Sequence, residues 1–134
     1  MSEAEVAAAV EAAEVALGLS ADELFDLKCA KHLRNDVGNA RRLIDRFGRD
    51  LMWVREVGWF AWVGTHWSRE DGERQAHLFA HKTAQAMWAE CAALEKAKPD
   101  DEEEQKAWAN NLLAHRKWAR ACGNSGRIRS MLGE

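Results

Sequence analysis

The sequence predicts an α+β fold that is mainly helical, with about five to six helices around a small three-stranded antiparallel meander. Helical periodicity with capping signals occupies both ends of the chain, and a glycine-flanked stretch rich in Trp, Val and Phe separates them. The length of 134 residues suits a single compact unit. Hydrophobic residues at 47% and charged residues at 31% exclude disorder throughout the chain.

Three helices are predicted in the first third of the chain. Two Ser-x-x-Glu capping boxes predict helices over residues 3–17 and 21–33. Asp36 is the predicted N-cap of a third helix over residues 37–47, and Gly48 is its predicted stop.

The sheet is predicted where the helical period is lost. Three strands are expected, at residues 51–55, 59–63 and 66–69. Alternate residues of the middle strand point to opposite faces of the sheet and are apolar on both, so both faces are expected to need other parts of the protein to cover them. The chain has seven Trp, and most of these rings are expected to be buried. Replacing Trp62 by alanine is accordingly expected to cost about 3–5 kcal/mol.

Helices return after the sheet. The longest is predicted over residues 72–97, with Pro99 as the break that follows it. The acidic run at residues 100–104 suits the first turn of a further helix, because carboxylates there meet unpaired backbone N–H groups. That helix is expected to reach about Cys122, and Ser125 is the predicted cap of a final short helix.

Positive charge collects near the C-terminal end, although the net charge of the chain is −3. Such a cluster suits contact with a phosphate backbone, and it equally suits a solvated face paired with the acidic run. Charge alone leaves these two interpretations about even. A second basic patch on the third helix is more typical of a helix surface, and two of its members are kept as candidate DNA contacts. The candidate DNA contacts are Arg116, Lys117, Arg120, Arg127, Arg129, Arg41 and Arg42.

No metal and no cofactor are expected. His77 and His81 have the four-residue spacing of helical metal ligands, but no sequence signal places a third ligand beside them. The cysteines Cys29, Cys91 and Cys122 are odd in number and widely spaced, which favours buried thiols in a reducing compartment over disulfides or a zinc clip.

Enzyme motifs are absent from the sequence. It contains no phosphate-binding loop, no G-x-G-x-x-G turn and no G-x-S-x-G elbow. The chain by itself is therefore not expected to be an ATPase, a dehydrogenase or a serine hydrolase. No basic leader segment and no apolar run of membrane-spanning length occur either, so a soluble protein is expected.

One segment resembles a known family. DVGNARRLIDRFGRDLMWVREVGWFAWVGTHWSRED combines D-x-G-N-A, a helix that ends in Gly and a Trp-rich hairpin. This combination resembles the domain that precedes the superfamily 3 helicase module in phage and plasmid primase-helicases, related to the amino-terminal-like domain of the poxvirus-type family. The resemblance extends over residues 36–132. The motif residues kept as structural are Asp36, Gly38, Asn39, Ala40, Gly48, Trp59, Trp62, Gly64 and Trp67.

The resemblance implies a non-catalytic domain of DNA replication. Its expected role is to position DNA and subunits next to the helicase ring, in the cytoplasm of a bacterial host or phage-infected cell. The partners it implies are DNA, the helicase module of the same or another chain, and further copies of this chain. The net charge of −3 predicts that DNA binding is weak, and contacts to phosphates predict that it has no sequence preference. The Walker motifs of such proteins lie outside this segment, so their chemistry is expected to be supplied elsewhere.

Two departures from the family pattern matter. Val63 stands where the pattern has Asp before the turn glycine, and a β-branched residue disfavours positive φ. Residues 1–35 fall outside the pattern, so they are predicted to be a helical extension or linker before a domain at 36–134. The alternative function is a self-standing interaction module, in which the acidic N-terminal helix docks on a partner protein and DNA is not bound.

Overall fold

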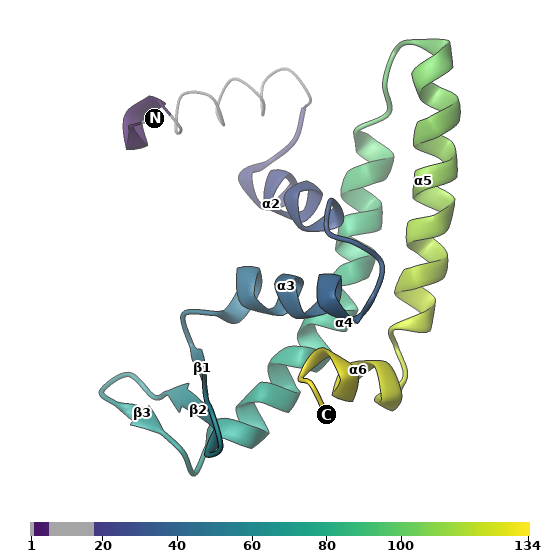
Figure 1. Cartoon of the computed structure of the whole chain (residues 1–134). Coiled ribbons are helices and arrows are strands. Elements are labelled where there is room, and N and C mark those ends of the chain that lie inside the picture. The colour runs from purple at the N-terminus through teal and green to yellow at the C-terminus, as the bar shows by residue number, and fades with distance from the viewer. Residues whose placement is uncertain (1, 6–17) are drawn as a thin grey trace. The chain divides into compact units, whose positions relative to one another are not determined.

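In a computed structural model that describes residues 2–5 and 18–134, the chain is α+β and mainly helical (Figure 1). This confirms the predicted fold class. The first predicted helix, 3–17, lies outside the described residues except for residues 3–5. The elements are α2 (Ala21–Ala30), α3 (Asp36–Phe47), β1 (Leu51–Val54), β2 (Gly58–Trp62), β3 (Trp67–Ser68), α4 (Gly72–Lys96), α5 (Glu102–Ala121) and α6 (Ser125–Met131).

The chain forms two compact units, which differ in charge. Residues 1–31 and 86–119 form one unit, and residues 32–85 and 120–134 form the other. The first has seven Lys and Arg against fourteen Asp and Glu, a net charge of −7, and is called the acidic unit. The second has twelve against eight, a net charge of +4, and is called the basic unit. The domain boundary suggested between residues 35 and 36 stays a prediction.

The acidic unit consists of α2, the C-terminal part of α4 and most of α5. The Nζ of Lys96 lies 2.6 Å from a carboxylate oxygen of Glu23, which ties α4 to α2. The indole N–H of Trp108 on α5 donates to the carbonyl oxygen of Leu94 on α4 at 2.6 Å. α5 begins at Glu102, as the acidic run predicts, with three glutamates in its first turn.

A buried polar pair crosses the interior of the acidic unit. His115 on α5 and Glu90 on α4 are both 0% exposed, and His115 Nε2 lies 3.0 Å from Glu90 Oε1. A buried polar side chain without a partner would destabilise the fold, so this contact fixes how α4 and α5 align within the unit.

The basic unit is built around a three-stranded antiparallel sheet in the order β1-β2-β3. Leu51 faces Ala61 across the first strand pair, and Trp62 faces Trp67 across the second. All three strands lie within two residues of their predicted bounds. Gly64 takes the positive φ of the second turn, at 95°, and Val63 keeps an ordinary backbone conformation.

Among the residues that the structure describes, only one face of the sheet is covered. Leu51 and Ala61 on that face are 5% and 2% exposed. α4 begins directly against the middle strand, because a Cβ on Gly72 would lie 1.8 Å from the carbonyl oxygen of Trp59. Phe47 of α3 and Phe79 of α4 stack with their ring centroids 4.4 Å apart, which joins these two helices.

Three predicted helix boundaries are wrong by one to three residues. The second helix ends at Ala30 instead of residue 33. Asn35, not Asp36, caps α3, and its side-chain oxygen accepts from the N–H of Gly38 at 2.8 Å. Asn124, not Ser125, caps α6 in the same way. Asn ranks with Asp and Ser at this position, so adjacent polar residues leave the choice of cap open in a sequence.

Among the described residues, no helix has both the length and the apolar character needed to span a membrane.

Candidate functional site

The D-x-G-N-A motif holds residues 32–33 against α3. A Cβ on Gly38 would lie 1.8 Å from the carbonyl oxygen of Leu33, so only glycine allows this approach. The guanidinium of Arg42 donates to the same oxygen at 2.9 Å and to the carbonyl oxygen of His32 at 3.0 Å. One turn earlier, Asn39 Oδ1 accepts from Arg42 at 3.3 Å. These contacts hold residues 32–33, which follow the end of α2 at Ala30, against α3.

The same motif reaches α6. The Nδ2 of Asn39, which is 0% exposed, lies 3.3 Å from the Sγ of Cys122 and donates to it. Burial raises the pKa of the Cys122 thiol. Asp36 accepts from the guanidinium of Arg127 at 3.1 Å. The motif therefore links residues 32–33, α3 and α6 within the basic unit.

The structure contradicts the prediction that Arg42 is a candidate DNA contact. Its side chain is 0% exposed and its guanidinium donates to backbone carbonyls inside the protein. A phosphate cannot reach it in this structure. Its neighbour Arg41 is exposed and stays a candidate.

The other candidate contacts are divided between the two units. Arg116 and Lys117 belong to the acidic unit, where Arg116 forms an ion pair with Glu95 at 3.4 Å. Arg120, Arg127 and Arg129 belong to the basic unit. Arg127 is held by Asp36, whereas Arg120 and Arg129 are exposed. The five bases that are clustered in sequence do not form one patch on one unit.

The uncovered face of the sheet is aromatic, although the sequence predicts that most Trp rings are buried. Trp62 and Trp67 face each other across β2 and β3, 42% and 37% exposed, with a T-shaped contact at 5.5 Å between ring centroids. Register places Phe60 and Met52 on the same face. The expectation that most Trp rings are buried is wrong, since Trp53 and Trp88 are exposed as well. This aromatic face consists of Met52, Phe60, Trp62 and Trp67.

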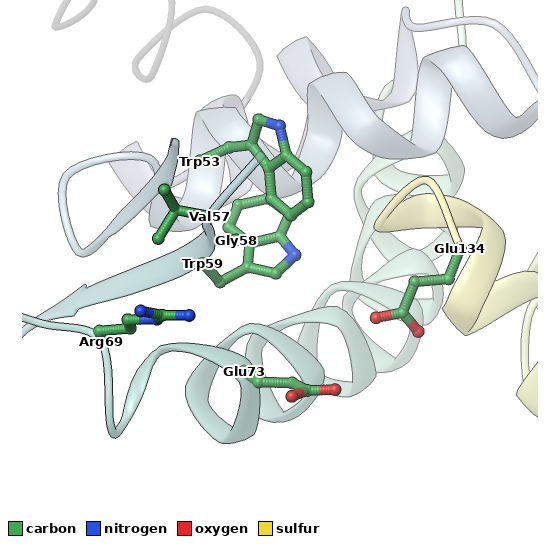
Figure 2. A pocket seen from close by; sticks show the side chains of 7 residues that line it. All are labelled: Trp53, Val57, Gly58, Trp59, Arg69, Glu73 and Glu134. Atoms are coloured by element: carbon green, nitrogen blue, oxygen red, sulfur yellow. The ribbon is translucent and has the colours of Figure 1, made fainter. Parts of the chain in front are cut away.

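A cavity of about 310 Å³ opens beside the covered face (Figure 2). Trp53 and Trp59 form one wall, with their ring centroids 5.1 Å apart in a T-shaped arrangement. The indole nitrogen of Trp59 is buried and has no hydrogen-bond partner within the described part of the chain. The remaining lining residues are Val57, Gly58, Arg69, Glu73 and Glu134.

A cluster of three ionisable side chains borders this cavity. His77 Nε2 lies 3.1 Å from Glu134 Oε2, and His77 Nδ1 lies 2.9 Å from the carbonyl oxygen of Glu73. The hydrogen bond to the Glu73 carbonyl is the main cause that raises the pKa of His77, and Glu134 adds to it. His81 is exposed and not part of the cluster. Glu134 follows His77 by 57 positions, so spacing along the chain gave no signal for this contact.

Comparison with known protein families shows to which family the chain belongs. The model of the D5 N-terminal-like family matches residues 40–134, which is more than half of the chain. The chain belongs to this family. D5 N-terminal-like domains are the N-terminal domains of D5-like primase-helicases of phages and plasmids. The assignment confirms the resemblance carried by the motif and the Trp-rich hairpin.

The D5 N-terminal-like match includes the whole sheet and the helices after it, but it begins after Asn39. Three motif residues, Asp36, Gly38 and Asn39, therefore precede the matched range. Asp36 and Asn39 contact Arg127 and Cys122 inside it, whereas Gly38 lies against Leu33 before it. No curated protein and no solved structure matches the chain.

The exposed position of Trp62 changes the expected cost of its removal. Trp62→Ala should lower the free energy of unfolding by only about 1 kcal/mol, because its side chain is 42% exposed and its ring forms an edge-to-face pair with Trp67. Leu51→Ala, on the covered face, should cost about 2–5 kcal/mol. Urea unfolding followed by circular dichroism measures both. Equal losses would contradict the division of the sheet into a covered and an uncovered face.

Proposed function

We propose that this D5 N-terminal-like domain positions DNA and neighbouring subunits next to the helicase module of a primase-helicase, and does not itself catalyse a reaction. Family membership supports the replication context. The observation that carries the DNA part of the proposal is the exposed aromatic face on the unit with a net charge of +4.

Positive charge on the basic unit favours a phosphate backbone. Arg41, Arg120 and Arg129 are exposed on its helices. Arg55 directly follows β1 and Arg69 directly follows β3, and both are exposed beside the sheet. Such residues attract DNA without reading its sequence, and salt weakens the contact because bound counterions are released.

The aromatic face favours a single strand over a duplex. Bases of a single strand stack on exposed aromatic rings, whereas bases in a duplex are already stacked on each other. Two Trp rings and one Phe ring on one face of a sheet provide such a surface. The acidic unit opposes binding, so the affinity of the whole chain should lie in the range of non-specific contacts, roughly 10⁻⁴ to 10⁻⁶ M, or be weaker.

The first test measures DNA binding by the whole chain. Fluorescence anisotropy with a labelled single strand and a labelled duplex, at about 50 and 200 mM salt, should show weak binding that salt strongly reduces. The single strand should bind more tightly than the duplex. Arg120→Glu combined with Arg129→Glu should abolish binding, and both residues are exposed, so the fold should be retained. Arg127 is left unchanged because it holds Asp36.

Matched control variants carry the same kinds of substitution on the acidic unit, outside the proposed DNA-binding surface. Lys28→Glu combined with Lys106→Glu changes the net charge equally, at exposed positions of the acidic unit, and should weaken binding far less. Trp62→Ala should weaken single-strand binding by about 5-fold or more, the effect of losing one stacked base. Trp88→Ala, at an exposed Trp of the acidic unit, should not. Absence of binding at low salt, or equal effects of both Trp changes, would contradict the proposal.

A protein-interaction module is the second candidate function. The observation that favours it is the net charge of −7 on the acidic unit, which suits a basic partner surface and repels DNA. If the chain binds neither DNA probe at low salt, this candidate becomes the better interpretation of the domain.

A further inference from the structure

Glu73, His77 and Glu134 place three potential metal ligands together in the basic unit. One oxygen of each carboxylate and one ring nitrogen of His77 all lie within 4.8 Å of one another. Glu73 and His77 are four residues apart on α4, which puts their side chains on one face of the helix. Glu134 comes from the segment that follows α6.

The ring of His77 already has the orientation that a metal ligand needs. A histidine that binds a metal through one nitrogen usually donates from the other to a carbonyl or carboxylate, which fixes the tautomer. Nδ1 of His77 lies 2.9 Å from the carbonyl oxygen of Glu73, so it donates there. Nε2 then faces the Glu134 carboxylate, 3.1 Å away, at a separation that suits two ligands of one ion.

The neighbouring cavity leaves space for water at the same position. Glu73 and Glu134 both line the cavity of about 310 Å³, and Figure 2 shows Glu73 extending from α4 and Glu134 from the C-terminal segment. Trp59 lines the same cavity, and its buried indole N–H has no hydrogen-bond partner in the described part of the chain.

We propose that Glu73, His77 and Glu134 bind a divalent transition-metal cation, and that Zn²⁺ fits best. One imidazole and two carboxylates form a donor set that zinc accepts, and their two negative charges balance the ion. Three protein ligands leave a fourth position for water. The bound ion joins the C-terminal segment to α4 within the basic unit, independently of any DNA contact.

This proposal replaces the sequence-based expectation of no metal near His77 and His81. His81 does not join the cluster, and the second carboxylate comes from a residue far away in the chain. Glu73 and His81 both have the four-residue spacing from His77 that suits helical ligands, and the geometry selects Glu73 together with Glu134.

Zinc titration of the whole chain tests the proposal. After treatment with a chelator, native mass spectrometry with ZnCl₂ should show one ion per chain, and isothermal titration should give the same stoichiometry. His77→Ala and Glu134→Gln should each weaken zinc binding by more than about tenfold. His81→Ala, one turn along the same helix, is the matched control and should leave zinc affinity unchanged. Mg²⁺ should bind far more weakly, since it prefers oxygen ligands in an octahedral cage.

Thermal unfolding gives a second readout. Zinc should raise the Tm of the wild-type chain and of His81→Ala, because a ligand that binds the folded state stabilises it. It should not raise the Tm of His77→Ala. Circular dichroism shows whether each variant is folded, and if His77→Ala is not, Glu134→Gln decides. Absence of stoichiometric zinc on the wild-type chain, or zinc affinity that is equal in wild type and both ligand variants, would overturn the proposal.

Discussion

Replacing Arg42 by methionine is expected to lower the free energy of unfolding by about 3–5 kcal/mol. The methionine fills part of the space but cannot donate to the carbonyl oxygens of His32 and Leu33 or to Asn39 Oδ1. Each buried acceptor left without a donor costs about 1–3 kcal/mol. Urea unfolding followed by circular dichroism measures the loss.

The neighbouring residue provides the control for this change. Arg41→Met removes the same charge from the same helix at an exposed position, so stability should change by less than about 0.5 kcal/mol. If the two variants were equally stable, the guanidinium of Arg42 would not hold residues 32–33 against α3. If Arg42→Met stayed stable and lost DNA binding, the original assignment of Arg42 as a DNA contact would be restored.

Replacing Gly38 by alanine is expected to cost about 3 kcal/mol, the upper part of the range for overpacking. The added Cβ would lie 1.8 Å from the carbonyl oxygen of Leu33, which is backbone and cannot rotate away. That oxygen also accepts from Arg42, so moving it disturbs a second contact. Urea unfolding measures the effect.

Gly123→Ala is the matched control for Gly38→Ala. A Cβ there would meet only the carbonyl oxygen of Arg120 at 3.5 Å, an ordinary contact, so stability should change little. Gly38→Ala with stability equal to that of Gly123→Ala would mean that residues 32–33 do not lie against α3 as described.

Periodicity and capping signals predicted the elements well because they are local. The strands of the meander and helices α4 and α5 were placed within two residues, since each depends on a pattern of adjacent residues. The cap predictions were wrong where two adjacent polar residues both suit the N-cap position. Asn35 and Asp36 are both good caps in a sequence, and only the hydrogen bond to Gly38 identifies Asn35.

Burial was the least predictable property. Alternation along β2 shows which residues share a face, but not which face is covered, so Trp62 was wrongly expected in the core. In the sequence, an arginine on a helix with several other bases is expected to be exposed to solvent. The side chain of Arg42 is instead buried, and its guanidinium donates to the backbone carbonyls of His32 and Leu33. Glu134 was equally hidden as a partner of His77, because it becomes a neighbour of His77 only after folding.

The division of the chain into interleaved units has a consequence for its synthesis. The polypeptide passes from one unit to the other three times, after residues 31, 85 and 119. On the ribosome, α2 emerges early, yet the rest of its unit follows only with residues 86–119. The basic unit likewise lacks α6 until residues 125–131 are added. Neither unit can complete its core before most of the other has been made, so the two units are expected to fold together and not one after the other.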